Sequence, residues 1–246
     1  MKKVTTEFIF ILLFILLLPS PQQHSSAQSN QPAAYLPILR SGRAPSLAGC
    51  PMFPENNVWN TPVDHLPVHP NSSTYVNTIG AARKVHADFG SGTWEGFPIG
   101  IPYVVVSGSQ PKVNVAFRWP EESDPGPYPI PANPPIEGDP DGSGDRHILM
   151  VDKDNCKLYE LFEAYKDTSD IWHAGSGVIF NLRSNILRPD KWTSADAAGL
   201  PILPGLARFD EVQQEAIYHA LRFTAPLTRS AYIWPARHEA SDLTGA

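Results

Sequence analysis

The chain has few cysteines and few charged residues, and each scarcity excludes a class of protein. Only 2 of its 246 residues are cysteine, which excludes a small fold held together by many disulfides. Charged residues make up 18% of the chain, and its formal net charge is -6 without any cluster of Lys or Arg. Nucleic acid, whose phosphates require a basic surface, is therefore not an expected partner.

Long apolar runs are also missing, apart from one near the N-terminus. Residues 1–27 have the parts of a secretory signal peptide: the basic residues Lys2 and Lys3, an apolar core at 8–18 and a small-residue end. That core is shorter than the roughly 20 residues that a membrane helix needs. We therefore predict a secreted or extracellular protein with no membrane insertion after signal removal.

The remainder reads as a linker followed by one domain. Residues 28–49 are rich in Ser, Pro, Gln and Ala and predict a disordered linker, and residues 50–246 predict a single β-rich domain. Cys50 and Cys156 are expected to form a disulfide in an oxidising compartment. The alternative is a lipoprotein signal at 47–50, which is disfavoured because a long polar segment separates it from the apolar core.

The expected fold class is mainly β (α+β), an antiparallel β-sandwich or jelly-roll-like domain with one main amphipathic helix. Runs rich in Val, Ile, Tyr and Phe predict strands at 103–107, 112–119, 146–151, 157–165, 177–182 and 231–234. Helical spacing of apolar residues predicts the main helix at 209–223. A short helical turn is expected at 193–198, where Gly199 would end it.

The stretch from 145 to 165 predicts a hairpin with a turn at 153–155. The register that we expect places His147 directly across from Glu160. Both side chains then share a face with Leu149 and Leu158, because side chains alternate along a strand. Large apolar residues on the opposite face indicate that the hairpin is central and covered on both sides.

The leading hypothesis for a catalytic site uses the carboxyl group of Glu160. Apolar neighbours would raise its pKa and keep it available as a proton donor. Asp145 is the better second carboxylate for a glycosidase, and His147 would orient or tune the pair. In a lyase, Arg146 would neutralise a uronate. A purely structural hydrogen bond between His147 and Glu160 is an equally weighted alternative.

Two further carboxylates are weaker partners for Glu160. Glu163 points to the opposite face of its strand and is expected to form a salt bridge with Arg146. Asp196 lies in the predicted helical turn.

Several aromatic and basic residues near element ends could bind substrate, since aromatic rings stack on sugar faces. The residues concerned are Trp172, His173, Trp192, His219, Arg222, Trp234, Arg237 and His238. Each ring taken singly is more often part of a core, and so is His219 on the predicted helix.

Neither a metal nor another cofactor is predicted. Four histidines and Glu160 supply ligand types, but no HxH or HExxH spacing is present. The DPDGSGD segment at 139–145 is spaced like a calcium loop but departs from an EF-hand, and a solvated turn is the preferred reading.

Three segments carry a resemblance to a known family: WTSADAAGLPILPGL at 192–206, HALRFT at 219–224 and WPARH at 234–238. They are similar to the signature of a family of secreted, mostly bacterial proteins with no assigned activity. The resemblance implies one exported domain and transfers no catalytic residue. Longer relatives continue past the WPARH segment, so a C-terminal portion is expected to be missing here.

Together these features predict a secreted protein that acts on extracellular polysaccharide. The first hypothesis is a glycan-cleaving enzyme, either a glycoside hydrolase or a polysaccharide lyase. The alternative is a non-catalytic glycan-binding or cell-surface module, in which the tryptophans form the binding platform. A metal-dependent enzyme is the third reading, and it would require at least three of the named His and Glu residues to converge.

Overall fold

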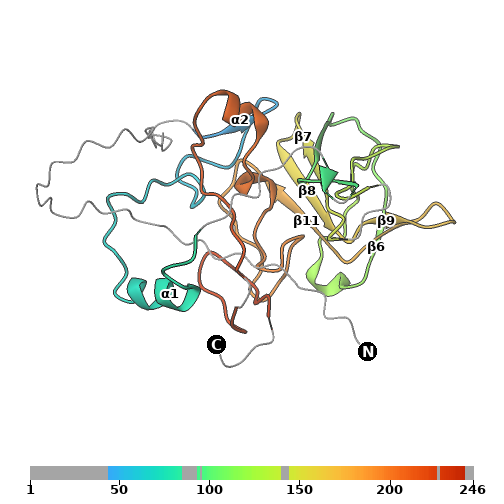
Figure 1. Cartoon of the computed structure of the whole chain (residues 1–246). Helices are drawn as coiled ribbons and strands as arrows, with labels where there is room; N and C mark the ends of the chain where they lie inside the picture. Colours follow the sequence, from blue (N-terminus) through green and yellow to red (C-terminus); the bar gives the residue numbers. More distant parts are fainter. Residues whose placement is uncertain (1–43, 85–92, 95, 140–143, 226–227, 242–246) are drawn as a thin grey trace, which may run out of the picture.

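The computed structural model describes residues 44–84, 93–94, 96–139, 144–225 and 228–241 (Figure 1). The predicted signal peptide and most of the predicted linker lie outside these residues. So does the middle of the DPDGSGD segment.

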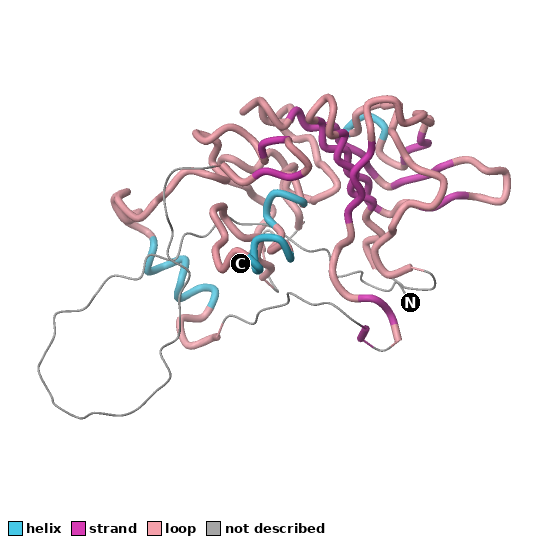
Figure 2. The backbone as a smooth tube through the Cα atoms, turned by 90° about the horizontal axis from the view of Figure 1, so that it is seen from above, coloured by secondary structure: helices cyan, strands magenta, loops and turns pink. Residues whose placement is uncertain are grey.

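Strands outnumber helices, and irregular segments connect them (Figure 2). The strands are β1 (Ser46–Leu47), β2 (Cys50–Pro51), β3 (Thr93–Trp94), β4 (Phe97–Pro98), β5 (Tyr103–Val106), β6 (Val115–Phe117), β7 (Ile148–Asp152), β8 (Lys157–Phe162), β9 (Tyr165–Lys166), β10 (Trp172–Ala174) and β11 (Ser176–Asn181). The helices are α1 (Ser72–Ile79), α2 (Phe209–Gln213) and the 3-10 turns η1 (Pro120–Glu122) and η2 (Leu203–Gly205). The mainly β, α+β class is confirmed, and the sandwich arrangement stays a prediction.

The largest sheet has four strands in the order β11-β8-β7-β5. The β11-β8 and β8-β7 pairs are antiparallel, but β5 runs parallel to β7, so the sheet is mixed. A second sheet, β6-β10-β9, pairs β10 in parallel with β6. The expected all-antiparallel arrangement is therefore wrong at these two pairs.

The four-stranded sheet is covered on both faces, as the sequence predicts. One face packs Leu149, Leu158 and Val178 against the N-terminal segment and the 195–206 segment. The other face packs Ile148 and Tyr159 against the three-stranded sheet and the loop around Tyr128. Because both faces are buried, these strands are almost continuously apolar.

A single long hairpin joins the two sheets. Strand β11 pairs with β8 from Ser176 opposite Phe162, and β10 pairs with β9 with His173 opposite Tyr165. These two pairings share one register, which places Glu163 opposite Gly175. Glu163 has a φ of 51°, a left-handed conformation that non-glycine residues rarely adopt, so the hairpin bends there. Beyond the bend β10 takes β6 as its other neighbour.

The predicted hairpin register is wrong by two residues. Glu160 lies opposite Leu149, not His147, and Asp152 pairs with Lys157. The Asp152 carboxylate accepts hydrogen bonds from the backbone N–H groups of Asp154 and Asn155, which fixes a four-residue loop. Because the shift is even, each side chain keeps the predicted face.

The predicted main helix is wrong in length. Helix α2 ends at Gln213, and Glu215 has a φ of 56°. Beyond it the backbone N–H of Ala220 donates to Trp59 O and that of Arg222 donates to Gly205 O. Pairing with other segments thus replaces helical hydrogen bonds after α2.

Two smaller predictions also differ from the structure. Residues 231–234 form no strand, and residues 193–198 form an irregular turn in place of a helical one. The hydroxyl of Ser194 donates to the carbonyl groups of Asp196 and Leu200, so side-chain bonds replace a helical ladder. Gly199 does end the turn with a positive φ of 72°.

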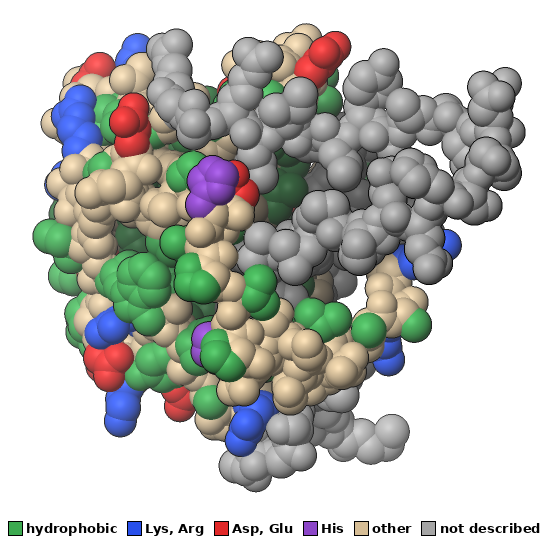
Figure 3. Space-filling model, turned by 90° about the vertical axis from the view of Figure 1, so that its left-hand side faces the viewer, with side chains coloured by type: hydrophobic (Ala, Val, Ile, Leu, Met, Phe, Trp, Pro, Cys, Tyr) green, Lys and Arg blue, Asp and Glu red, His purple; other side chains and the backbone are tan. Residues whose placement is uncertain are grey.

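Helix α1 lies apart from the sheets in Figures 1 and 2, and none of its residues is buried. On the face drawn in Figure 3, the Lys and Arg side chains of the described residues stand apart, with acidic side chains interspersed.

The predicted disulfide is confirmed. Cys50 and Cys156 are bonded with an S–S distance of 2.01 Å across a sequence separation of 106. The bond occupies the sulfur that a lipoprotein signal would need to leave free. It also ties the short β1-β2 hairpin to the loop after β7, so the last residues of the predicted linker, 44–49, belong to the folded part.

We expect the disulfide to contribute about 4–5 kcal/mol of stability, because it closes a loop of about a hundred residues. The double variant Cys50→Ser with Cys156→Ser should melt about 10–15 °C below the oxidised parent, measured by scanning calorimetry. A reductant should lower the parent to the same value and leave the variant unchanged. Equal melting temperatures for the two proteins would show that the bond adds nothing.

Candidate functional site

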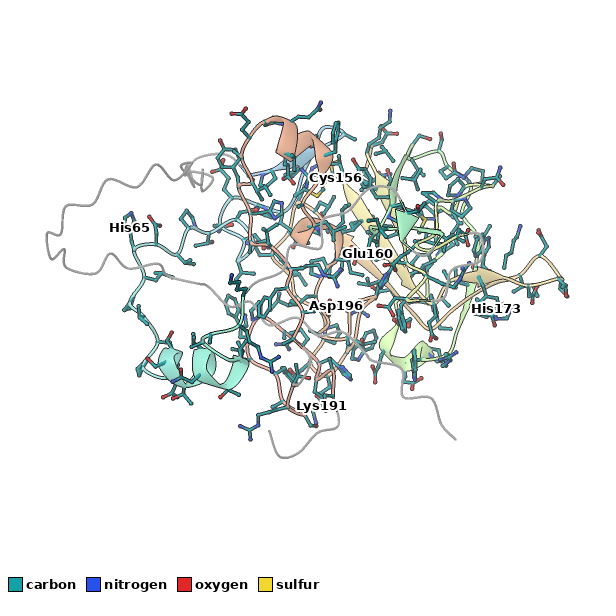
Figure 4. The ribbon with its side chains drawn as sticks, viewed as in Figure 1. His65, Cys156, Glu160, His173, Lys191 and Asp196 are labelled. Atoms are coloured by element: carbon teal, nitrogen blue, oxygen red, sulfur yellow. A yellow bond between two sulfur atoms is a disulfide. The ribbon has the colours of Figure 1, made fainter. Side chains whose placement is uncertain are left out.

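Two polar places stand out in the described structure. One is a buried group at the centre of the molecule, where Glu160 and Asp196 lie (Figure 4). We call it the central charge cluster, and its members are Glu137, Asp145, His147, Glu160, Asp196 and Arg222. The other surrounds His173, well away from the first in Figure 4.

Glu160 is fully buried on β8 and bonded to backbone. The N–H of Ile202 donates to both carboxylate oxygens at 3.0 and 2.9 Å, and the N–H of Leu203 donates to Oε1 at 2.9 Å. Burial raises the pKa of Glu160 to about 7, against the lowering effect of these two N–H groups. The carboxyl group therefore fixes the start of η2.

His147 binds Glu137 instead of Glu160. Its Nδ1 lies 2.6 Å from Glu137 Oε2 and its Nε2 lies 3.0 Å from the carbonyl oxygen of Ala195. Both partners accept hydrogen bonds, so both ring nitrogens must carry a proton and the ring is an imidazolium. Burial alone would lower the pKa of His147, but the hydrogen bond and charge of Glu137 outweigh it and raise the pKa.

The pKa of Glu137 shifts in the opposite direction to that of His147. Burial alone would raise the pKa of Glu137, but the hydrogen bond and charge of His147 lower it. The pair therefore holds the 130s loop against the start of β7 as an ionised contact.

Asp196 and Arg222 form the third part of the cluster. Asp196 Oδ1 accepts the N–H of Ala198 at 2.7 Å, and Arg222 Nη2 lies 3.4 Å from Asp196 Oδ2. Burial raises the pKa of Asp196 to about 7, although the charge of Arg222 lowers it. Burial lowers the pKa of Arg222, and the charges of four neighbouring carboxyl groups act in the raising direction. The cluster thus joins five separate chain segments.

The other two predicted catalytic residues lie at the edge of the cluster. Asp145 is half-buried, and burial raises its pKa. Arg146 pairs with Asp139 at 2.9 Å and not with Glu163 as predicted. Glu163 instead pairs with Arg118 at 2.7 Å, because the bend of the hairpin turns it toward the other sheet.

The predicted substrate-binding residues are spread over several places. Trp172 and His173 lie on β10, where Trp172 is buried. Trp192, Arg237 and His238 lie along the 188–198 segment, where Arg237 donates to Arg188 O and His238 Nδ1 bonds Ala197 O. Buried His219 contacts Glu211, Arg222 belongs to the central charge cluster, and Trp234 is 67% exposed.

The second polar place is a hollow of about 190 Å³ on the three-stranded sheet. We call it the bend hollow, and its lining is Ala116, Phe117, Arg118, Glu163, Tyr165, His173, Ala174 and Gly175. It arises because Ala116 lies beside His173 on the neighbouring strand and Gly175 follows two residues later. Both positions lack a large side chain, so space remains among larger neighbours.

The walls of the bend hollow are aromatic on one side and charged on another. The rings of Tyr165 and His173 stack with centroids 5.0 Å apart and planes 9° apart. His173 Nε2 lies 2.8 Å from Asp167 Oδ2, which orients the ring. Arg118 and Glu163 form the ion pair opposite, with the Arg118 guanidinium 5.1 Å from the ring centre of Trp119.

The packing at the bend leaves no room for a side chain at Gly175. A Cβ at Gly175 would lie 2.8 Å from Trp119 Cζ3, 2.8 Å from Phe162 Cδ1 and 3.1 Å from Glu163 Oε2. Gly175 therefore lets the Trp119 and Phe162 rings and the Glu163 carboxylate approach the backbone.

Three important residues of these places, Glu137, Arg118 and Tyr165, were not predicted from the sequence. Glu137 sits in a Pro/Gly/Asp loop without periodicity, and no local pattern identifies it as the partner of His147. Arg118 gave a usable signal, because the alternation of its strand places Ala116 and Arg118 on one polar face.

Neither possible metal ligands, nor membrane-spanning helices, nor comparisons with known proteins assign a function to the chain. Among the described residues no three His, Cys, Asp or Glu side chains are grouped so as to hold a metal ion. The helices in that part of the chain are too short or too polar to cross a membrane. No family model, curated protein or solved structure matches the chain.

The raised pKa of Glu160 predicts that stability falls as pH rises. A carboxyl group with a folded pKa above its ordinary value stabilises the fold fully below that ordinary value, and the contribution is lost as pH rises through about 7. Asp196 and His147 have the same sign, whereas Glu137 has the opposite one. The shift of Glu160 from 4.5 to about 7 corresponds to roughly 3 kcal/mol.

We therefore expect the free energy of unfolding to decrease from pH 5 to pH 8, measured by denaturant titration. Glu160→Gln keeps an acceptor oxygen for Ile202 or Leu203 but cannot titrate, so its decrease should be smaller. The matched control is Glu55→Gln at an exposed position, which should keep the parental slope. Parallel curves for Glu160→Gln and the parent would contradict the assignment.

Proposed function

We infer that the protein is an exported carbohydrate-binding domain whose binding site is the bend hollow. The predicted signal peptide and the disulfide between Cys50 and Cys156 support export. The observation that carries the proposal is the hollow itself, which is lined by an aromatic stack, an ion pair and three small residues. A sugar offers an apolar C–H face for the ring and hydroxyl groups for the charged side chains.

The size of the bend hollow suits one small unit of a larger ligand, such as a single sugar residue. Pockets for drug-sized ligands run to roughly 300–1,000 Å³, and about 190 Å³ is below that range. Tyr165 is 49% exposed at its rim, so a chain of sugars could continue past it. Binding one residue of a long polysaccharide is consistent with both features.

The burial of Glu160 supports binding over cleavage. A general acid has to reach the glycosidic oxygen, whereas Glu160 is enclosed and both of its oxygens are bonded to backbone N–H groups. His147 is likewise occupied at both nitrogens. Their contacts favour a structural role for each residue, although the expected hydrogen bond between the two is replaced by bonds to other partners.

Glycan cleavage is a second candidate because one observation favours it. Glu160 and Asp196 both have a pKa raised to about 7, and perturbed carboxyl groups gather at catalytic sites. Because burial is the cause of both raised pKa values, this candidate requires a substrate that reaches the pair while water stays excluded.

The binding proposal predicts that Tyr165→Ala weakens binding to its polysaccharide. We expect about a three- to tenfold loss, the range of one aromatic contact, in a panel of immobilised plant, bacterial and algal polysaccharides. Tyr75→Ala is the matched control, because Tyr75 is 41% exposed and also stacks on a histidine, His69. Equal loss in both variants, or no binding by the folded parent, would reject the bend hollow.

The cleavage candidate is checked on the same panel by following reducing ends and the absorbance of unsaturated products. The binding proposal expects no product and unchanged binding by Glu160→Gln. Product formation that disappears in Glu160→Gln would instead establish an enzyme.

A further inference from the structure

The chemistry of the bend hollow narrows the kind of sugar that it can bind, on the basis of the function proposed above. Within the described residues, two full charges face it: the guanidinium of Arg118 and the carboxylate of Glu163, 2.7 Å apart. The lining also has two weaker polar groups: the ring of His173, whose Nε2 is bonded to Asp167, and the hydroxyl group of Tyr165. The recognition surface therefore combines one strong donor group with one strong acceptor group.

The Arg118 side chain has a contact outside the hollow, and hydrogen bonds fix the backbone of both charged residues. Arg118 lies over the Trp119 ring, 5.1 Å from its centre, and its backbone N–H donates to Ala174 O. Glu163 has the left-handed backbone of the bend, where its N–H donates to Asp145 O at 2.7 Å. Strained backbone of this kind is often found at binding sites. The ion pair is thus a preorganised element, although the Arg118 side chain is 60% exposed.

Charge disfavours acidic and basic sugars in this hollow. Arg118 and Glu163 are already paired, so a uronate carboxylate could bind Arg118 only in competition with Glu163, and the ammonium group of an amino sugar could bind Glu163 only in competition with Arg118. Like charges at such distances repel, and repulsion of this kind is a common source of specificity. A neutral sugar meets neither penalty.

The donor and acceptor pattern then selects neighbouring hydroxyl groups. Guanidinium only donates hydrogen bonds, and an ionised carboxylate only accepts them. A hydroxyl group can do both, so one hydroxyl can accept from Arg118 while its neighbour on the same ring donates to Glu163. Tyr165 and His173 supply the aromatic wall for the C–H face of that ring.

We propose that the bend hollow binds one neutral sugar residue through two adjacent free hydroxyl groups, with the Arg118–Glu163 ion pair as the specificity determinant. The pair distinguishes this class from uronates by the carboxylate of Glu163 and from amino sugars by the guanidinium of Arg118. Removing one charge should therefore change the preference as well as the affinity.

The test compares binding of the full secreted chain to neutral polysaccharides, to their O-methylated forms, to polygalacturonate and to chitosan. The probes are a β-glucan, a mannan, a galactan and an arabinoxylan, and affinity electrophoresis gives the dissociation constants. We expect binding to at least one neutral polymer and loss of that binding when its hydroxyl groups are methylated. Arg118→Gln should weaken it at least about tenfold, since hydrogen bonds to charged groups are lost.

Glu163→Gln gives the sharper result. It removes the negative charge and leaves Arg118 free to bind an anion, so binding to polygalacturonate should rise relative to the parent while neutral binding falls. A residue with only a structural role would not produce this reversal. Arg183→Gln, an exposed charge change at the end of β11, is the matched control and should bind like the parent. Unchanged melting temperatures confirm that each variant is folded.

The possible failures are distinct. Preferential binding of the parent to polygalacturonate or chitosan, or a Glu163→Gln variant without a shift toward polygalacturonate, would overturn the neutral-diol inference and leave carbohydrate binding intact. Absence of binding to every polymer would overturn the proposed function itself.

Discussion

The hairpin from Lys157 to Asn181 is the constraint on which the rest of the structure depends. It keeps one register through its bend, so each of its two chain segments is an inner strand of one sheet and the edge strand of the other: β8 and β10 are inner strands, and β9 and β11 are edge strands. Because Gly175 has no Cβ, the bend can bring Glu163, Phe162 and Trp119 close together. The bend hollow is a consequence of this change of partners, since a straight hairpin would continue the four-stranded sheet.

The central charge cluster performs a different task. Burying ionised groups is unfavourable unless each is paired and hydrogen-bonded, and several contacts here join segments that are distant in the sequence. His147 connects the 130s loop with Ala195, and Glu160 holds the backbone of Ile202 and Leu203. With few helices and long irregular segments, the fold relies on such contacts for the positions of its loops. The perturbed pKa values therefore accompany a structural role.

The sequence predicted the parts of the structure that depend on local pattern. Alternation identified the two faces of the β7-β8 hairpin, and the two cysteines identified the disulfide. The predicted register was wrong because the turn is fixed by a hydrogen bond to the side chain of Asp152. Such a local bond cannot be read from a strand pattern. Helix α2 stopped early because Ala220 and Arg222 bond to distant backbone groups. The His147–Glu137 contact was equally inaccessible, since it joins a strand to an aperiodic loop.

Chemistry-bearing residue types placed the predicted catalytic site in the central charge cluster, whereas the binding site that we propose lies at the bend hollow. A His and a Glu on an apolar face are strong signals for catalysis in a sequence, but an apolar face is also where the fold needs buried acceptors. Arg118 and Glu163 look ordinary because each is a charged residue at a strand end. They form an ion pair because the bend brings their two chain segments together, next to the small residues Ala116 and Gly175. The proposed binding surface depends on where large side chains are missing, and the small residues Ala116 and Gly175 indicate such a place only once the pairing of β6 with β10 is known.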